Sequence, residues 1–158
     1  MQLSSRKTFL IGAILALAVG VSAAVASANL PASSAGSITV YKTATCGCCS
    51  KWIDHLRASG FTVDAKDVTE AALVSMKRDV GVPSELESCH TAIVDGYVVE
   101  GHVPADVIRE FLDEHPKAVG LAVPGMPLGS PGMESDVKQP YNVLVFDASG
   151  TSKVYRSR

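Results

Sequence analysis

The chain has 158 residues, a formal net charge of −2, four cysteines, 47% hydrophobic residues and 19% charged residues. Its apolar-rich composition excludes a disordered polypeptide, and its length allows one ordinary domain. The near-neutral charge, without a run of lysines and arginines, argues against a nucleic-acid partner.

Residues 1–28 have the pattern of a secretory signal peptide. Arg6 and Lys7 precede an uncharged apolar run over residues 9–21, and small residues at 26–28 form a cleavage site. This run is too short for a transmembrane anchor, which needs about 20 apolar residues. We therefore predict cleavage after residue 28, an exported protein, and no membrane attachment once the signal is removed.

After a short leader at 29–36, the chain predicts alternating strands and helices. In chain order we expect a strand at 37–42, a helix at 49–59, a strand at 61–68, a helix at 70–80, two strands at 91–94 and 97–100, and a helix beginning at Pro104. Asp95-Gly96 between the paired strands favours a tight hairpin. This β-α-β-α-β-β-α order is typical of a thioredoxin-like fold of the α/β (α+β) class, in one domain over residues 37–158.

Residues 117–139 are rich in Pro and Gly and show no hydrophobic period, so we expect a long loop. Met126 and Met133 lie in Pro-Gly-Met segments of this loop, where no periodic core accounts for them. After the loop, strands at 141–146 and 151–155 are expected to form a C-terminal hairpin.

The cysteines are concentrated at one point of the predicted fold. Cys46, Cys48 and Cys49 lie within four residues, where the first strand runs into the first helix, and Cys89-His90 directly precedes the third strand. In a thioredoxin-like layout these two segments face each other. We therefore expect the four thiols and His90 to converge, and His102 could reach the same end of the sheet.

Three kinds of chemistry fit such a cluster. Structural disulfides fit poorly, because a 48–49 bridge is strained and a short loop removes little unfolded-state entropy. Thiol–disulfide exchange would use Cys46 and Cys49, which have C-x-x-C spacing at a helix N-terminus, with Cys89 as a resolving thiol. Soft-metal binding fits best, because crowded thiolates can bridge Cu(I) ions, and the thioethers of Met126 and Met133 favour copper.

Several linked blocks carry a resemblance to a known family. They are CGCC at 46–49 followed by Trp52, GVP at 81–83, SCHT at 88–91, DGY at 95–97, EGHVP at 100–104 and the Pro/Gly/Met segment at 120–134. Together they resemble a bacterial family of periplasmic metal-binding proteins that includes the CopG-type copper-resistance proteins. The resemblance covers roughly residues 38–158, which is nearly all of the chain that remains after cleavage of the signal peptide.

The resemblance implies a periplasmic, thioredoxin-like domain that binds copper through its C-x-C-C motif. We expect it to hold one or several Cu(I) ions in copper resistance, and Cu(I)/Cu(II) redox cycling would make it a copper oxidoreductase. Its expected partners are copper ions and other periplasmic copper-handling proteins. The predicted ligands are Cys46, Cys48, Cys49, Cys89, His90, Met126 and Met133.

Overall fold

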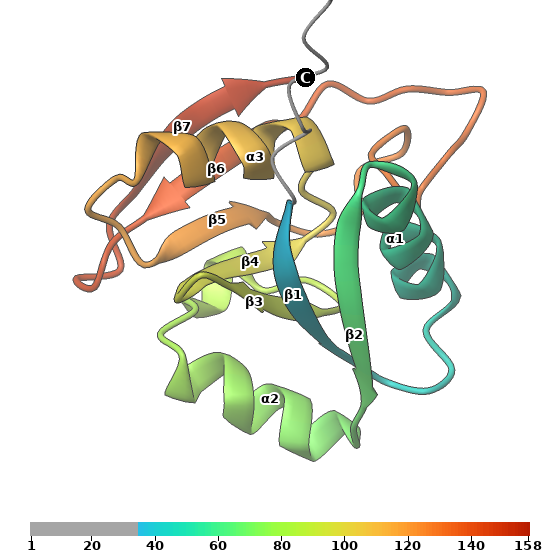
Figure 1. Cartoon of the computed structure of the whole chain (residues 1–158), viewed down its shortest axis with the longest axis horizontal. Helices are drawn as coiled ribbons and strands as arrows, with labels where there is room; N and C mark the ends of the chain where they lie inside the picture. Colours follow the sequence, from blue (N-terminus) through green and yellow to red (C-terminus); the bar gives the residue numbers. More distant parts are fainter. Residues whose placement is uncertain (1–34) are drawn as a thin grey trace, which may run out of the picture. The chain divides into compact units, whose positions relative to one another are not determined.

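The computed structural model describes residues 35–158, which form one seven-stranded sheet with three α-helices (Figure 1). The signal peptide predicted at 1–28 and the leader as far as residue 34 lie outside the described residues. Within residues 35–158, no helix has the length and hydropathy needed to cross a membrane.

The order of elements confirms the predicted mixed α/β (α+β) class and the β-α-β-α-β-β-α core. The elements are β1 (Ala35–Lys42), α1 (Gly47–Ala58), β2 (Phe61–Asp67), α2 (Glu70–Asp79), the 3-10 helix η1 (Ser84–Leu86), β3 (Thr91–Val94), β4 (Tyr97–Gly101), α3 (Ala105–Glu114), β5 (Gly120–Val123), β6 (Asn142–Phe146) and β7 (Ser152–Ser157). The first strand begins two residues before its predicted start.

Local sequence signals explain where several of these elements begin and turn. The Thr69 side chain accepts a hydrogen bond from the backbone N–H of Ala72 at 3.2 Å, and so caps α2. Between β3 and β4, Asp95 and Gly96 have φ angles of 48° and 82°. A two-residue hairpin turn of this kind requires positive φ at both positions, which Asp-Gly supplies at low cost.

The sheet order is β2-β1-β3-β4-β5-β6-β7, with parallel pairing of β1 with β2 and of β4 with β5. In the antiparallel pairs, Tyr41 lies opposite Thr91 and Thr91 lies opposite Glu100. The parallel pair of β4 and β5 aligns Gly101 with Val123. Consequently, the segments after β1, β4 and β5 and the segment before β3 all emerge at one end of the sheet.

Alternating side chains bury both faces of the sheet. Val99 packs in a core cluster with Trp52 of α1 and Phe111 of α3, so these two helices cover one face. Its neighbour Val98 points the other way, into a smaller cluster that includes Leu86 of η1. This alternation follows from the two-residue period of a strand.

The strand β5 occupies the start of the loop predicted over 117–139, and the sequence prediction missed it. Its four residues are buried between β4 and β6, which supply its hydrogen bonds. Gly120 is required there, because a Cβ atom would lie 1.9 Å from the carbonyl oxygen of Val98. The rest of the loop, residues 124–141, contains no helix or strand, and the predicted C-terminal hairpin is confirmed as β6 and β7.

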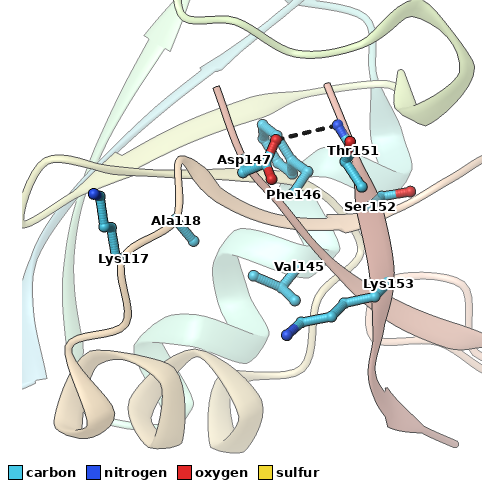
Figure 2. Close-up of a pocket in the computed structure, with 8 residues that line it drawn as sticks. All are labelled: Lys117, Ala118, Val145, Phe146, Asp147, Thr151, Ser152 and Lys153. Carbon is cyan, nitrogen blue, oxygen red and sulfur yellow. Dashed lines mark hydrogen bonds between the residues drawn. The ribbon is translucent and has the colours of Figure 1, made fainter. Parts of the chain in front are cut away.

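A pocket of about 180 Å³ opens at the other end of the sheet (Figure 2). Phe146, which pairs with the first residue of β5, marks this end. The pocket is lined by Lys117, Ala118, Val145, Phe146, Asp147, Thr151, Ser152 and Lys153. No cysteine or histidine is among these lining residues, and the Asp147 carboxylate already accepts hydrogen bonds from Ser149 and Thr151 within its own turn.

Candidate metal centre

The C-x-C-C segment lies at the start of α1, where the chain leaves the end of β1. Cys46 is the N-cap residue, with extended backbone angles, and Cys48 and Cys49 belong to the first turn. Cys46 and Cys49 are joined by a disulfide, whereas Cys48 and Cys89 are free thiols. The helix start therefore gathers three sulfur atoms.

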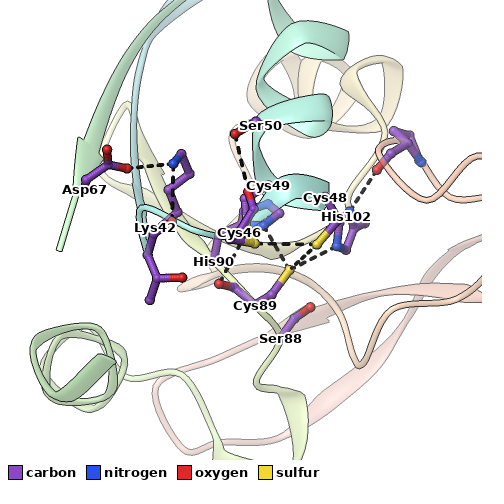
Figure 3. Close-up of a disulfide and its surroundings, with 12 residues drawn as sticks. Lys42, Cys46, Cys48, Cys49, Ser50, Asp67, Ser88, Cys89, His90 and His102 are labelled. Atoms are coloured by element: carbon purple, nitrogen blue, oxygen red, sulfur yellow. Dashed lines mark hydrogen bonds and ion pairs between the residues drawn. A yellow bond between two sulfur atoms is a disulfide. The ribbon is translucent and has the colours of Figure 1, made fainter. Parts of the chain in front are cut away.

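The fourth sulfur comes from the segment that enters β3, as the sequence analysis predicts. The Sγ atom of Cys48 lies 3.5 Å from that of Cys46 and 3.6 Å from that of Cys89. All four sulfur atoms lie within 4.8 Å of one another, although Cys48 and Cys89 are 41 residues apart in the chain. Figure 3 shows them gathered beside the start of α1. The expected convergence is confirmed, and the role of the thiols as metal ligands stays a prediction.

Two histidines extend this cluster on the Cys89 side. The Sγ atom of Cys89 lies 3.4 Å from Nδ1 of His90 and 3.1 Å from Nε2 of His102 (Figure 3). The Nδ1–H group of His102 donates to the carbonyl oxygen of Pro131 at 2.8 Å. That bond leaves Nε2 of His102 with its lone pair facing the thiol, as a metal ligand requires.

The ring of His90 is completely buried between Trp52 and His102, at centroid distances of 4.3 and 5.0 Å. Within the part of the chain that the structure describes, its Nε2 atom has no hydrogen-bond partner. Burial lowers the pKa of both His90 and His102, so each imidazole is neutral near neutral pH. Neutral imidazole is the form that coordinates a metal.

His102 is not among the ligands predicted from the sequence, because spacing alone does not show how far its side chain reaches. The sequence does contain an indication that His102 lies near the cluster. Glu100-Gly101-His102 stands at the end of the strand predicted at 97–100, and that strand is expected to pair with the strand at 91–94, which begins directly after His90. The register of β3 and β4 then brings the two histidines together.

Burial raises the pKa of the Cys89 thiol to about 12, and the neighbouring Cys48 sulfur acts in the same direction. The thiol is therefore protonated at neutral pH in the metal-free protein. A resolving cysteine attacks a disulfide as the thiolate, so this environment does not favour that role for Cys89.

The Pro/Gly/Met loop closes over this end of the sheet. Besides the bond from His102 to Pro131, the hydroxyl of Ser88 donates to the carbonyl oxygen of Gly125 at 2.5 Å. Met126 follows Gly125 and is 52% exposed, whereas Met133 is half-buried. The loop is thus held at two points, by Ser88 next to Cys89 and by His102, and the two thioethers remain predicted ligands.

Comparison with known proteins gives the family. The family model described as "Protein of unknown function, DUF411" matches residues 86–133. A solved structure titled "Copper resistance protein copG- Form 1" is 44% identical and covers 78% of this chain and 97% of its own, with a TM-score of 0.72. This chain belongs to the CopG copper-resistance family. The Form 2 structure is 47% identical, with coverages of 78% and 98% and a TM-score of 0.72, and no curated protein matches.

The Pro/Gly/Met loop packs closely against the start of α1 at Gly132. Gly132 has a φ of +85°, and a Cβ atom there would lie 2.7 Å from the carbonyl oxygen of Cys48 and 2.9 Å from the amide nitrogen of Trp52. The loop can approach the helix this closely only because position 132 has no side chain.

We expect Gly132→Ala to lower the free energy of unfolding by about 1–3 kcal/mol, measured by urea denaturation, because left-handed strain and backbone contact act together. Gly125→Ala is the matched control, since Gly125 also has positive φ, at +68°, but its Cβ would meet nothing within 4 Å. Equal losses in the two variants would show that the contact with α1 adds nothing to stability.

Proposed function

We propose that this chain is a periplasmic copper-binding protein of copper resistance that holds Cu(I) on Cys46, Cys48, Cys49 and Cys89. The observation that carries the proposal is the set of four sulfur atoms within 4.8 Å of one another. Thiolates select soft metals, and Cu(I) tolerates the low coordination numbers that a crowded, sulfur-bridged site imposes.

The surroundings of the four sulfurs support copper more than zinc. A structural zinc site takes four separate ligands in a tetrahedral arrangement, commonly from two well-spaced pairs. Here three thiols share four residues, and a second donor group, made by Cys89 with His90 and His102, shares the Cys89 sulfur. The solved relatives are named copper-resistance proteins, and Met126 and Met133 offer thioethers that suit copper.

The protein's own groups prepare the site for a cation. The start of α1 carries Cys46, Cys48 and Cys49, and all three sulfurs are available as ligands once the disulfide is reduced. Pro131 holds His102 in the tautomer that presents Nε2. The donor set would suit both oxidation states of copper, because sulfur ligands favour Cu(I) and imidazole also suits Cu(II). Redox cycling would then use an external one-electron acceptor and donor.

The same proposal includes export of the protein, cleavage after residue 28, and transfer of copper to other periplasmic copper-handling proteins. The supporting observation is the signal pattern in residues 1–28. The thioredoxin-like assignment is likewise proposed, supported by a parallel β1-α1-β2 unit joined to the antiparallel β3–β4 hairpin and α3.

A second candidate function is thiol–disulfide exchange by Cys46 and Cys49. The disulfide between them at the start of α1 favours it, since C-x-x-C pairs at helix N-termini are typical of such enzymes. The high pKa of Cys89 argues against a role for it as the resolving thiol in this exchange.

One experiment separates the two functions. The protein is reduced and handled without oxygen, Cu(I) is added, and bound copper and free thiols are counted. We expect stoichiometric copper that is lost on Cys48→Ser or Cys89→Ser, because each variant removes a central sulfur. Weak copper binding, together with reduction of insulin disulfides that survives Cys48→Ser, would establish the oxidoreductase instead.

A further inference from the structure

A buried ion pair lies directly behind the Cys89 segment. Lys77 of α2 and Glu100 of β4 are in direct contact, and their side chains are 3% and 0% exposed. Removing two charges from water is costly, and replacing such a pair with apolar side chains is often neutral or stabilising. Stability alone therefore gives little reason for a lysine and a glutamate at these two positions.

The hydrogen bonds of Glu100 show what the pair holds. Besides Lys77, its carboxylate accepts from the backbone N–H of Ser88 at 2.6 Å and from the hydroxyl of Thr91 at 2.7 Å. The Lys77 ammonium also donates to the Thr91 hydroxyl oxygen at 3.0 Å. Ser88 and Thr91 are the residues immediately before and after Cys89-His90. The buried Glu100 carboxylate therefore forms hydrogen bonds on both sides of this dipeptide.

The same strand fixes the dipeptide at a third point. Gly101, next to Glu100, donates its N–H to the carbonyl oxygen of His90 at 3.0 Å. Gly101 has a φ of +71°, and a Cβ there would lie 2.6 Å from the side chain of Ser88. The end of β4 thus packs closely against the segment that carries Cys89.

We propose that Lys77 and Glu100 are positioning residues for the metal centre, which hold Cys89 and His90 in place for Cu(I) through Ser88 and Thr91. This inference rests on the proposed copper-binding function. Ligands that are already in position before the metal binds lose little conformational entropy on binding. Loss of the residues that hold metal ligands in position therefore typically lowers metal affinity.

The sharpest test uses a matched pair at Thr91, a completely buried residue. Thr91→Val keeps the shape but removes the hydroxyl, whereas Thr91→Ser keeps the hydroxyl. We expect Thr91→Val and Glu100→Gln to weaken Cu(I) binding by about 10- to 100-fold in competition with a chromogenic Cu(I) chelator. Thr91→Ser should retain an affinity close to that of the unchanged protein.

The copper-thiolate charge-transfer spectrum provides a readout that a purely structural role would not move. Thr91→Val should alter the spectrum of the loaded protein at temperatures where it is fully folded, and Thr91→Ser should restore it. Glu110→Gln is the control, because it breaks the ion pair of Glu110 with Arg156, which joins α3 to β7. It should leave both affinity and spectrum unchanged.

The outcomes separate this inference from the proposed function. If the unchanged, reduced protein binds no Cu(I), the proposed function falls. If it binds Cu(I) and folded Thr91→Val keeps the same affinity and spectrum, the positioning role alone is overturned. Should Glu100→Gln fail to fold, the Thr91 pair still decides the question, because the ion pair itself stays intact in both variants.

Discussion

Opening the Cys46–Cys49 disulfide is expected to increase the amount of Cu(I) that the protein binds by about twofold or more, because only free thiols become thiolate ligands. With the disulfide closed, two of the four clustered sulfurs are unavailable, and only Cys48 and Cys89 remain as free thiols. The measurement is an oxygen-free Cu(I) titration of the reduced protein and of the same protein after oxidation by diamide, with thiols counted in each.

A double variant, Cys46→Ser with Cys49→Ser, controls for oxidation elsewhere. This variant lacks the thiols of Cys46 and Cys49 under both reducing and oxidising conditions. It should therefore bind as much copper as the oxidised, unchanged protein. An equal copper content in the reduced and oxidised proteins would contradict the prediction and would remove Cys46 and Cys49 from the ligand set. The same titration would then point to a smaller site around Cys89, His90 and His102.

Cu(I) affinity is expected to rise as the pH rises through neutrality, by about tenfold per pH unit for each thiol proton released. Burial raises the pKa of Cys89 to about 12, so the free thiol keeps its proton over this range, whereas the bound thiolate has lost it. Binding therefore releases that proton, and a lower proton concentration favours the bound state. Chelator competition at several pH values around neutrality measures the slope.

Cys89→Ser should reduce this slope by one proton, in addition to weakening binding. Direct measurement of protons released on adding Cu(I) to weakly buffered protein gives an independent value. Affinity that does not change with pH would mean that Cys89 is not a thiolate ligand.

Parts of the fold could be predicted because their causes are local. Thr69 caps α2 through an amide only three residues away, and Asp95-Gly96 forms its turn from its own backbone preferences. By contrast, β5 is four residues long and shows no period of its own. It is a strand because β4 and β6 satisfy its backbone hydrogen bonds, and both neighbours are identified only when the chain is folded.

The candidate site divides in the same way. Cys46, Cys48 and Cys49 are neighbours in the chain, so their crowding is visible in the sequence. The sequence also predicts the order of the elements as far as α3, the signal pattern and the blocks by which the family is recognised. These features follow from residue types and short spacings, which do not depend on the rest of the fold.

The sequence predicts that Cys89 approaches the C-x-C-C segment only by way of the expected fold. Only the tertiary structure shows that the Cys89 sulfur lies 3.6 Å from that of Cys48, that His102 contacts the Cys89 sulfur, and that Lys77 and Glu100 are buried together. Each of these contacts joins elements that are distant in the chain. Their energies depend on burial and on which partners the fold brings within hydrogen-bond distance, and neither can be read from local spacing.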